Sequence, residues 1–230
     1  MKQWTKIKGE NAWTMFKVIS EMVDGFERLN EIGPCVSIFG SARTKSDHPH
    51  YQLAVDVAKR LTEEGFGVIT GGGPGIMEAG NRGAQQEDGV SVGLGIDLPF
   101  ETGVNEFVDS DKVLNHRFFF VRKVMFVKYA QGFVVLPGGL GTMDELFEVL
   151  TLMQTKKITK VPVVLVGKDY WSGLKKWIKN VMYKKAGNIN KKDLDLMPIV
   201  ETADEAVDII CNFYKKGKGS GELAPNYQME

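Results

Sequence analysis

Residues 133–142 read Phe-Val-Val-Leu-Pro-Gly-Gly-Leu-Gly-Thr, an uninterrupted apolar run that ends in a glycine turn. The run is typical of a buried β-strand, and residues 142–155 after the turn carry apolar positions at helical spacing. The same order of strand, small-residue turn and helix occurs twice more, at residues 35–64 and 66–86. The chain is therefore predicted to alternate strands with helices.

The predicted strands are continuous apolar runs, which is typical of strands that are buried on both faces. Further strands are predicted at residues 91–96, 161–166 and 198–200, and further helices at 118–130, 170–183 and 203–214. We therefore predict an α/β fold of the Rossmann-like, doubly wound type, with a parallel sheet covered by helices on both faces. Ligands of such sheets bind outside the carboxyl ends of the strands, where the glycine turns are expected.

Length and composition fit one core, because 230 residues lie at the upper edge of a single domain and 43% of them are hydrophobic. Residues 1–32 are predicted to form an N-terminal helical extension, with apolar positions three or four residues apart. Residues 33–216 are predicted to form the Rossmann-like domain, in which residues 97–115 are a long connection without clear periodicity. Residues 217–230 are predicted to be a disordered tail.

Charge and cysteine content exclude several classes of protein. The chain has 29 basic and 29 acidic residues, so we predict neither a nucleic-acid partner nor a membrane partner. No apolar stretch of about 18 residues and no leader segment is visible, and the two cysteines are too few for a disulfide framework. These features predict a cytoplasmic protein. His48, His50 and His116 lack metal-ligand partners at suitable spacing and are expected on the surface or in loops, so we predict no metal and no cofactor.

The glycine turns are candidates for binding a phosphate, because they bring backbone N–H groups to the positive end of a helix. The candidate residues for this contact are Gly138, Gly139, Gly141 and Thr142 in the last turn, Gly72 and Gly73 in the second, and Ser41 in the first. The alternative is that the glycines only make sharp turns. No lysine follows the last glycine, so a nucleoside triphosphatase loop is disfavoured, and the dinucleotide fingerprint is incomplete.

Two further features have both a structural and a chemical interpretation. Glu145 follows Thr142 by three residues, a spacing that suits either a capping box or a catalytic carboxylate at the cleft. Arg122 and Lys123 project from an almost wholly apolar helix, so each must reach an anion, a salt-bridge partner or water.

The stretch Pro-Gly-Gly-Leu-Gly-Thr-Met-Asp-Glu at residues 137–145 resembles the Pro-Gly-Gly-x-Gly-Thr-x-x-Glu signature of the Lonely Guy family, the cytokinin riboside 5'-monophosphate phosphoribohydrolases. Arg122 and Lys123 resemble the Arg-Lys pair of the second family motif. The family commonly has Met-His-x before that pair, where this chain has Phe-Phe-Val at residues 119–121. The leading helix resembles the larger bacterial branch of the family.

The resemblance implies an enzyme that hydrolyses the N-glycosidic bond of a nucleoside 5'-monophosphate, either AMP or a cytokinin riboside monophosphate, to the free base and ribose 5-phosphate. It implies that Glu145 is the catalytic carboxylate and that Arg122 holds the substrate and stabilises charge, with Lys123 beside it. The glycine turns and Ser41 would bind the 5'-phosphate, and Glu101 would reach the base or sugar. Many relatives carry the label lysine decarboxylase, but no pyridoxal-phosphate site is visible.

Two alternatives stay open at this point. A non-catalytic nucleotide carrier or sensor would keep the same glycine turns, and a nicotinamide-dependent oxidoreductase would need the complete dinucleotide fingerprint and an acidic residue after the second strand. The resemblance also implies a homodimer with the cleft near the interface, and the apolar leading helix could pack between subunits.

Overall fold

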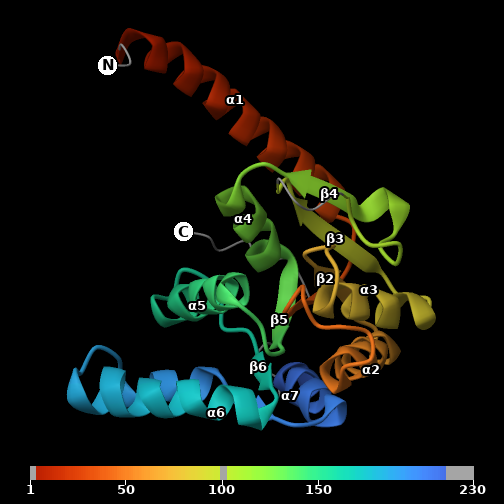
Figure 1. Cartoon of the computed structure of the whole chain (residues 1–230), viewed down its shortest axis with the longest axis vertical. Helices are drawn as coiled ribbons and strands as arrows, with labels where there is room; N and C mark the ends of the chain where they lie inside the picture. Colours follow the sequence, from red (N-terminus) through yellow and green to blue (C-terminus); the bar gives the residue numbers. More distant parts are fainter. Residues whose placement is uncertain (1–3, 99–102, 216–230) are drawn as a thin grey trace.

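A seven-stranded parallel sheet forms the centre of the molecule (Figure 1). The computed structural model describes residues 4–98 and 103–215, and the side chains from residue 11 onward. The strands are β1 Cys35–Phe39, β2 Gly67–Thr70, β3 Ser91–Ile96, β4 Val113–His116, β5 Ala130–Val135, β6 Val163–Val166 and β7 Ile199–Val200, in the spatial order β4-β3-β2-β1-β5-β6-β7. Each neighbouring pair is parallel, so the predicted doubly wound fold is confirmed.

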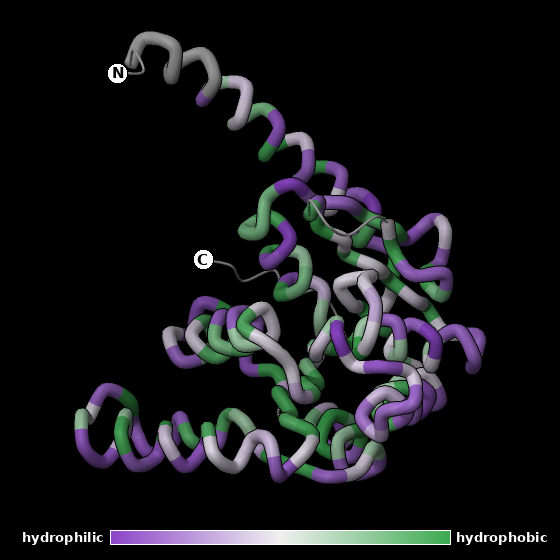
Figure 2. Tube along the Cα trace, viewed as in Figure 1, coloured by the Kyte–Doolittle hydropathy of each residue, from purple (hydrophilic) through white to green (hydrophobic). Residues whose placement is uncertain are grey.

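The helices cover both faces of the sheet. They are α1 Trp4–Leu29, α2 Pro49–Glu63, α3 Ile76–Gln86, α4 Phe119–Tyr129, α5 Leu140–Gln154, α6 Lys168–Trp177 and α7 Ala203–Lys215, with shorter helical segments η1 Ser110–Lys112, η2 Ile178–Lys185 and η3 Lys191–Leu196. One core cluster joins one sheet face to α4, α5, α6 and the end of α1, and the other joins the opposite face to α2, α3 and α7. Figure 2 shows the resulting hydrophobic strands between mixed helices.

The order of the strands places a topological switch point between β1 and β5. The chain leaves β1 toward β2 on one side, and it leaves β5 toward β6 on the other side. The two connections therefore diverge at the carboxyl ends of these neighbouring strands, which is where ligands of open α/β sheets bind. Backbone contacts join the two strand ends: Leu136 donates to the carbonyl of Phe39 (2.8 Å), and Ser41 donates to that of Pro137 (3.1 Å).

Two expectations from the sequence were wrong. Residues 97–115 were expected to be a long connection without clear periodicity, but the end of this segment forms the edge strand β4, which pairs with β3. His116, expected on the surface or in a loop, is the buried last residue of this strand, and its Nδ1 lies 3.1 Å from the carbonyl oxygen of Gly95. The strand alternates, with Leu114 and His116 buried and Asn115 exposed, so it lacks the continuous apolar run of the central strands.

The other outcomes concern the two ends of the chain. The leading helix is present as α1, which begins before the apolar positions that predicted it. The predicted tail at 217–230 lies outside the described residues. No helix in the described part of the chain is long and apolar enough to cross a membrane.

Candidate active site

The turn after β5 opens the amino end of α5 at the switch point. Gly139 precedes the first residue of α5 without a side-chain cap, and Gly139, Leu140 and Gly141 are exposed. The N–H groups of the first turn of a helix have no partner within the helix, and they carry the positive end of its dipole. The first turn of α5 holds no acidic residue. This end of the helix can therefore accept an anion.

Thr142 and Tyr170 both pack against the turn at Gly138. A Cβ at Gly138 would stand 2.1 Å from Oγ1 of Thr142, so the close approach of Thr142 to the turn requires glycine. The hydroxyl of Tyr170, at the start of α6, donates to the carbonyl of Gly138 (2.5 Å). In a trans peptide the carbonyl and the next N–H point in opposite directions, so this bond points the N–H of Gly139 away from Tyr170. The sequence did not indicate Tyr170.

Glu145 lies in the second turn of α5, and its side chain is turned into the protein. Only 8% of its surface is exposed. Burial raises its pKa to about 7, against the opposing effect of the positive charges of Arg122 and Lys123. The capping-box interpretation is wrong, because α5 begins at Leu140 and thus places Glu145 beyond the N3 position. A buried carboxyl with a pKa near neutrality is suited to acid–base chemistry.

Arg122 is anchored by the carboxyl ends of two strands on the other side of the switch point. Its Nε donates to the carbonyl of Leu94 in β3 (2.7 Å), and Nη2 donates to that of Gly71 after β2 (3.3 Å). The guanidinium also lies 5.1 Å from the centre of the Phe126 ring. The positive charge of Arg122 on α4 has the largest lowering effect on the pKa of Glu145 on α5, so the two groups interact electrostatically.

Lys123 has a different environment from its neighbour. Its Nζ lies 2.8 Å from a carboxylate oxygen of Asp144 and 3.3 Å from one of Glu148, both on α5. Burial alone would lower its pKa, but the hydrogen bond to Asp144 and the charges of Glu145, Asp144 and Glu148 outweigh burial, so the pKa is raised. Lys123 therefore joins α4 to α5 as a fixed ammonium.

The second glycine turn, residues 71–75, is enclosed rather than open. Gly71, Gly72 and Gly73 are buried. The N–H of Gly72 donates to the hydroxyl of Thr70 (2.9 Å), and its carbonyl accepts from the backbone N–H of Asn105 (2.7 Å). Both backbone polar groups of Gly72 are therefore hydrogen-bonded within the protein.

Two asparagines that the sequence analysis missed hold this second turn. The side-chain amide of Asn105 donates to the carbonyls of Gly72 (3.0 Å) and Gly73 (3.1 Å) and to Oδ1 of Asn81 (3.0 Å). Asn81 is fully buried in α3, and its amide donates to Ser91 (2.9 Å). Its place on the apolar face of a predicted helix was the available signal, since a buried polar side chain needs partners.

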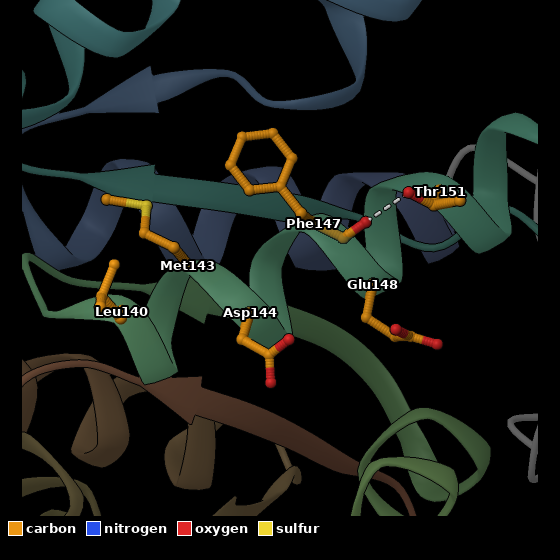
Figure 3. Close-up of a pocket in the computed structure, with 6 residues that line it drawn as sticks. All are labelled: Leu140, Met143, Asp144, Phe147, Glu148 and Thr151. Carbon is orange, nitrogen blue, oxygen red and sulfur yellow. Dashed lines mark hydrogen bonds between the residues drawn. The ribbon is translucent and has the colours of Figure 1, made fainter. Parts of the chain in front are cut away.

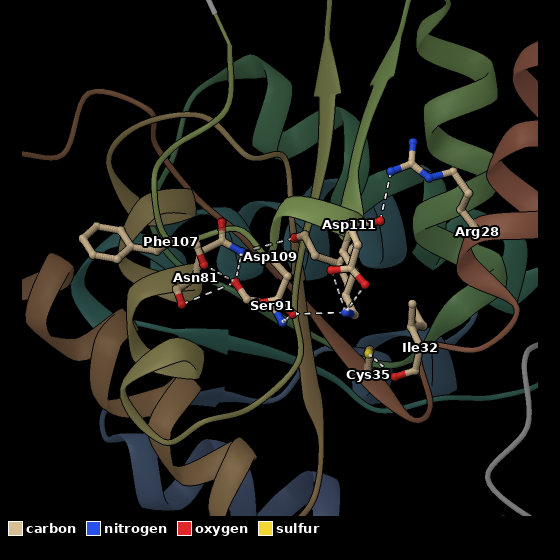
Figure 4. Close-up of polar contacts among 10 residues, drawn as sticks. Arg28, Ile32, Cys35, Asn81, Ser91, Phe107, Asp109 and Asp111 are labelled. Carbon is tan, nitrogen blue, oxygen red and sulfur yellow. Dashed lines mark hydrogen bonds and ion pairs between the residues drawn. The ribbon is translucent and has the colours of Figure 1, made fainter.

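A row of polar contacts from Ser91 holds the segment that follows Asn105. The Ser91 hydroxyl donates to the carbonyl of Phe107 (2.7 Å), and the Ser91 N–H donates to the carboxylate of Asp109 (3.1 Å). Figure 4 shows these residues together with Asn81. The connection between β3 and β4 is therefore pinned to the strand and helix that frame the second turn.

The remaining predicted site residues are placed as follows. Ser41 lies at the switch point, half-buried, and its Oγ accepts the N–H of Arg43 (3.1 Å). Glu101 lies outside the described residues. Within the described residues no group of three or more His, Cys, Asp or Glu side chains could hold a metal ion.

A shallow hollow of about 340 Å³ lies on the outer face of α5 (Figure 3). Its lining residues are Leu140, Met143, Asp144, Phe147, Glu148 and Thr151. Its lining is apolar and acidic, without a basic side chain, so it is unsuited to a phosphate. Neither Glu145 nor Arg122 is among these residues, so these two side chains do not line the hollow.

A family model and individual similar proteins both match this chain. A family model described as "possible lysine decarboxylase" matches residues 77–210. A cytokinin riboside 5'-monophosphate phosphoribohydrolase of Mycobacterium marinum is 27% identical over 164 residues, which cover 70% of this chain and 85% of that protein. The enzyme of the same name from Mycobacterium tuberculosis is 27% identical over 162 residues, which cover 68% and 82%.

Solved structures share the fold at lower identity. The molybdenum cofactor binding protein from Rippkaea orientalis superposes with a TM-score of 0.58 at 20% identity, covering 79% of this chain and 97% of that chain. The Moco carrier protein from Chlamydomonas reinhardtii gives 0.58 at 21% identity, covering 80% and 99%. At such identities the likeness is one of fold.

Proposed function

Because the chain belongs to the family described as possible lysine decarboxylases, which includes the Lonely Guy phosphoribohydrolases, we propose that it hydrolyses the N-glycosidic bond of a nucleoside 5'-monophosphate. The products are the free base and ribose 5-phosphate. The observation that supports this proposal is the combination of a buried carboxyl with a pKa of about 7, an anchored guanidinium whose charge lowers that pKa, and an open helix end at the carboxyl edge of the sheet.

The open end of α5 binds the 5'-phosphate of the substrate. The N–H groups of Gly139, Gly141 and Thr142 and the dipole of the helix supply donors and positive potential without a lysine. Ser41, from the neighbouring strand end, supplies a further hydroxyl donor. Binding the phosphate fixes the position of the ribose, so that its C1' faces the side of α5 that carries Glu145.

Glu145 and Arg122 act on the sugar and on water. As the bond from C1' to the base nitrogen breaks, positive charge develops on the ribose, and an ionised Glu145 stabilises it. Water adds to C1' and gives one proton to the Glu145 carboxylate, while the departing base takes up one proton from solvent at the nitrogen that was bonded to C1'. Glu145 then returns its proton to solvent. Arg122 favours the ionised form of Glu145 and contacts the hydroxyls or phosphate of the substrate.

The description lysine decarboxylase does not fit this site. Pyridoxal-phosphate chemistry needs a lysine that forms a Schiff base as a neutral amine. Lys123, the lysine next to Arg122, is paired with two carboxylates and its pKa is raised. It is therefore held in the charged form, which is not a nucleophile.

The relatives' names support a cytokinin riboside monophosphate as one substrate, and AMP is the other candidate. We extend the proposal to a homodimer, as in the resemblance stated above, with the cleft near the interface. A second subunit against the outer face of α5 would cover Leu140, which is 90% exposed beside the proposed phosphate turn.

The test is an assay of ribose 5-phosphate release from AMP, GMP, CMP and cytokinin riboside monophosphates. We expect release from at least one of them, and a loss of about 10³-fold in kcat/KM for Glu145→Gln. Asp144→Asn is the matched control, because Asp144 is the exposed neighbour on the same helix. It is expected to stay within about threefold of the parent.

Binding without release has a separate meaning. If these nucleotides bind but no ribose 5-phosphate forms from any of them, the chain is a nucleotide carrier or sensor on this fold. If Glu145→Gln is as fast as the parent, the assignment of the carboxylate is wrong.

A further inference from the structure

Only the carboxyl half of α1 packs on the rest of the protein. Val18 and Met22 lie against the core, and Leu29 is fully buried. In contrast, residues 11–17 are exposed on all sides. Figure 1 shows this end of α1 projecting away from the sheet. An isolated helical segment of this length is marginal in water, so contacts with another surface are needed to hold it.

The projecting helix carries a continuous apolar stripe. Its members are spaced three or four residues apart and are exposed to 70% (Trp13), 65% (Phe16), 52% (Ile19), 53% (Val23) and 37% (Phe26). This spacing places them on one face of the helix. The rings of Trp13 and Phe16 pack on one another, 6.1 Å apart. Figure 2 shows the alternation of hydrophobic and hydrophilic positions along α1.

We propose that this apolar stripe pairs antiparallel with the same stripe of a second copy of the chain. A two-fold axis passes close to Ile19 and sets Trp13 opposite Phe26 of the partner subunit and Phe16 opposite Val23 of the partner subunit. Such an isologous contact uses one patch twice, so no other partner is required. This surface is distinct from the outer face of α5.

The exposed area is sufficient for such a pair. An aromatic side chain offers about 150–250 Å², and with the exposed fractions above the stripe and Met15 present roughly 700 Å² of apolar surface. A standard interface buries about 800 Å² on each partner. The polar positions that flank the stripe supply the remainder.

The charges on the helix argue against a lipid surface as the occupant. Over the whole of α1 there are four acidic residues, at 10, 21, 24 and 27, and four basic ones, at 6, 8, 17 and 28. Helices that bind anionic membranes carry an excess of Lys and Arg on the polar face. The charges of α1 balance, so the helix lacks this basic excess and is suited to pairing with a protein.

The first test is the mass of the full chain in solution, measured by light scattering at micromolar concentration. We expect at least twice the 25.6 kDa of one chain, and Phe16→Glu with Ile19→Glu is expected to halve the observed mass. Thr14→Glu, on the opposite and exposed side of α1, is the control and is expected to leave the mass unchanged. A monomeric parent, or a mass that the double variant does not change, would overturn the proposal.

The second test reads the geometry directly. Ile19→Cys lies near the two-fold axis and is expected to form an intermolecular disulfide under mild oxidation, whereas Thr14→Cys is not. The native Cys35 and Cys211 are buried and do not compete. Equal cross-linking of both variants would overturn the antiparallel pairing. Co-sedimentation of the parent with phosphatidylglycerol vesicles that is lost in the double variant would also overturn it, in favour of a lipid partner.

Discussion

The two glycine turns at the carboxyl edge of the sheet look alike in sequence but differ in what they present. The turn at 137–141 leaves Gly139 and Gly141 exposed at the amino end of α5. In the turn at 71–75 the first three glycines are buried. Gly72 is hydrogen-bonded to Thr70 and Asn105, and the carbonyl of Gly73 also accepts from Asn105. The first can offer donors to a ligand, whereas the second makes room for a side chain: a Cβ at Gly71 would stand 2.2 Å from Nη2 of Arg122.

The comparison shows that a run of glycines has two unrelated physical uses. In one turn the absence of a side chain exposes N–H groups. In the other it permits a positive φ, +72° at Gly72, and the close approach of a cation to the backbone. The two turns thus serve the two partners of the proposed reaction: the first leads into the helix with Glu145, and the second supports Arg122.

The largest expected effect concerns the buried acid of the first region. The pKa of Glu145 is raised from 4.5 to about 7 by burial, so the native state binds this proton more tightly than the unfolded state. Its contribution to stability is complete below about pH 4.5 and is lost as the pH rises through about 7. Glu145→Gln removes this loss. Between pH 4 and pH 9 the free energy of unfolding of the variant should therefore rise relative to that of the parent by on the order of 3 kcal/mol.

Urea unfolding of both proteins at pH 5, 7 and 9 measures this difference. Glu148→Gln is the matched control, because Glu148 lies on the same helix as Glu145. The substitution breaks its ion pair with Lys123 of α4 and is not expected to raise the free energy of unfolding at pH 9. A parent–variant difference that stays constant between pH 5 and pH 9 would show that the carboxyl titrates alike in the folded and unfolded states.

The central strands could be predicted from the sequence, whereas several contacts around the candidate site could not. The strands with nearly continuous apolar runs were recognised because burial on both faces leaves few polar positions, whereas the short alternating edge strand Val113–His116 was missed. The capping box failed because Gly139 starts α5 earlier than Thr142 would. Asn81 and Asn105 were missed because their contact joins residues 24 positions apart, which no local pattern encodes.

A second prediction separates the two uses of glycine. In Gly71→Ala the new methyl group would meet Nη2 of Arg122 and Sδ of Met77, at 2.2 and 2.6 Å, so Arg122 must move. We expect kcat to fall about 30-fold, within the range for loss of an electrostatic contact in a transition state. Gly173→Ala, where nothing lies within 4 Å of the new Cβ, is the control.

A double-mutant cycle makes this prediction sharper. If the glycine acts through the guanidinium, Gly71→Ala combined with Arg122→Ala will be no slower than Arg122→Ala alone. Additive losses would mean that Gly71 affects activity by another route, and the role given to the second turn would fail.

A third prediction concerns the support of the second turn. Asn105→Ala removes the side-chain bonds to the carbonyls of Gly72 and Gly73, which relaxes the turn that anchors Arg122. We expect kcat to fall about tenfold with KM changed less than about twofold, and the unfolding free energy to fall by about 2 kcal/mol. Steady-state kinetics and urea unfolding measure both. Gln52→Ala, an exposed amide on α2, is the control, and a change in KM alone would contradict the assignment.

The smallest expected effect concerns the first turn, at residues 137–141, and it is a change in KM rather than in kcat. Tyr170→Phe keeps the ring but removes the bond to the carbonyl of Gly138, which orients the N–H of Gly139. A hydrogen bond is worth about 1 kcal/mol, so KM should rise about fivefold with little change in kcat, while Tyr183→Phe on η2 is the control. If Tyr170→Phe leaves KM unchanged and Asn105→Ala raises it, the phosphate binds at the second turn, and the division of labour between the two turns is reversed.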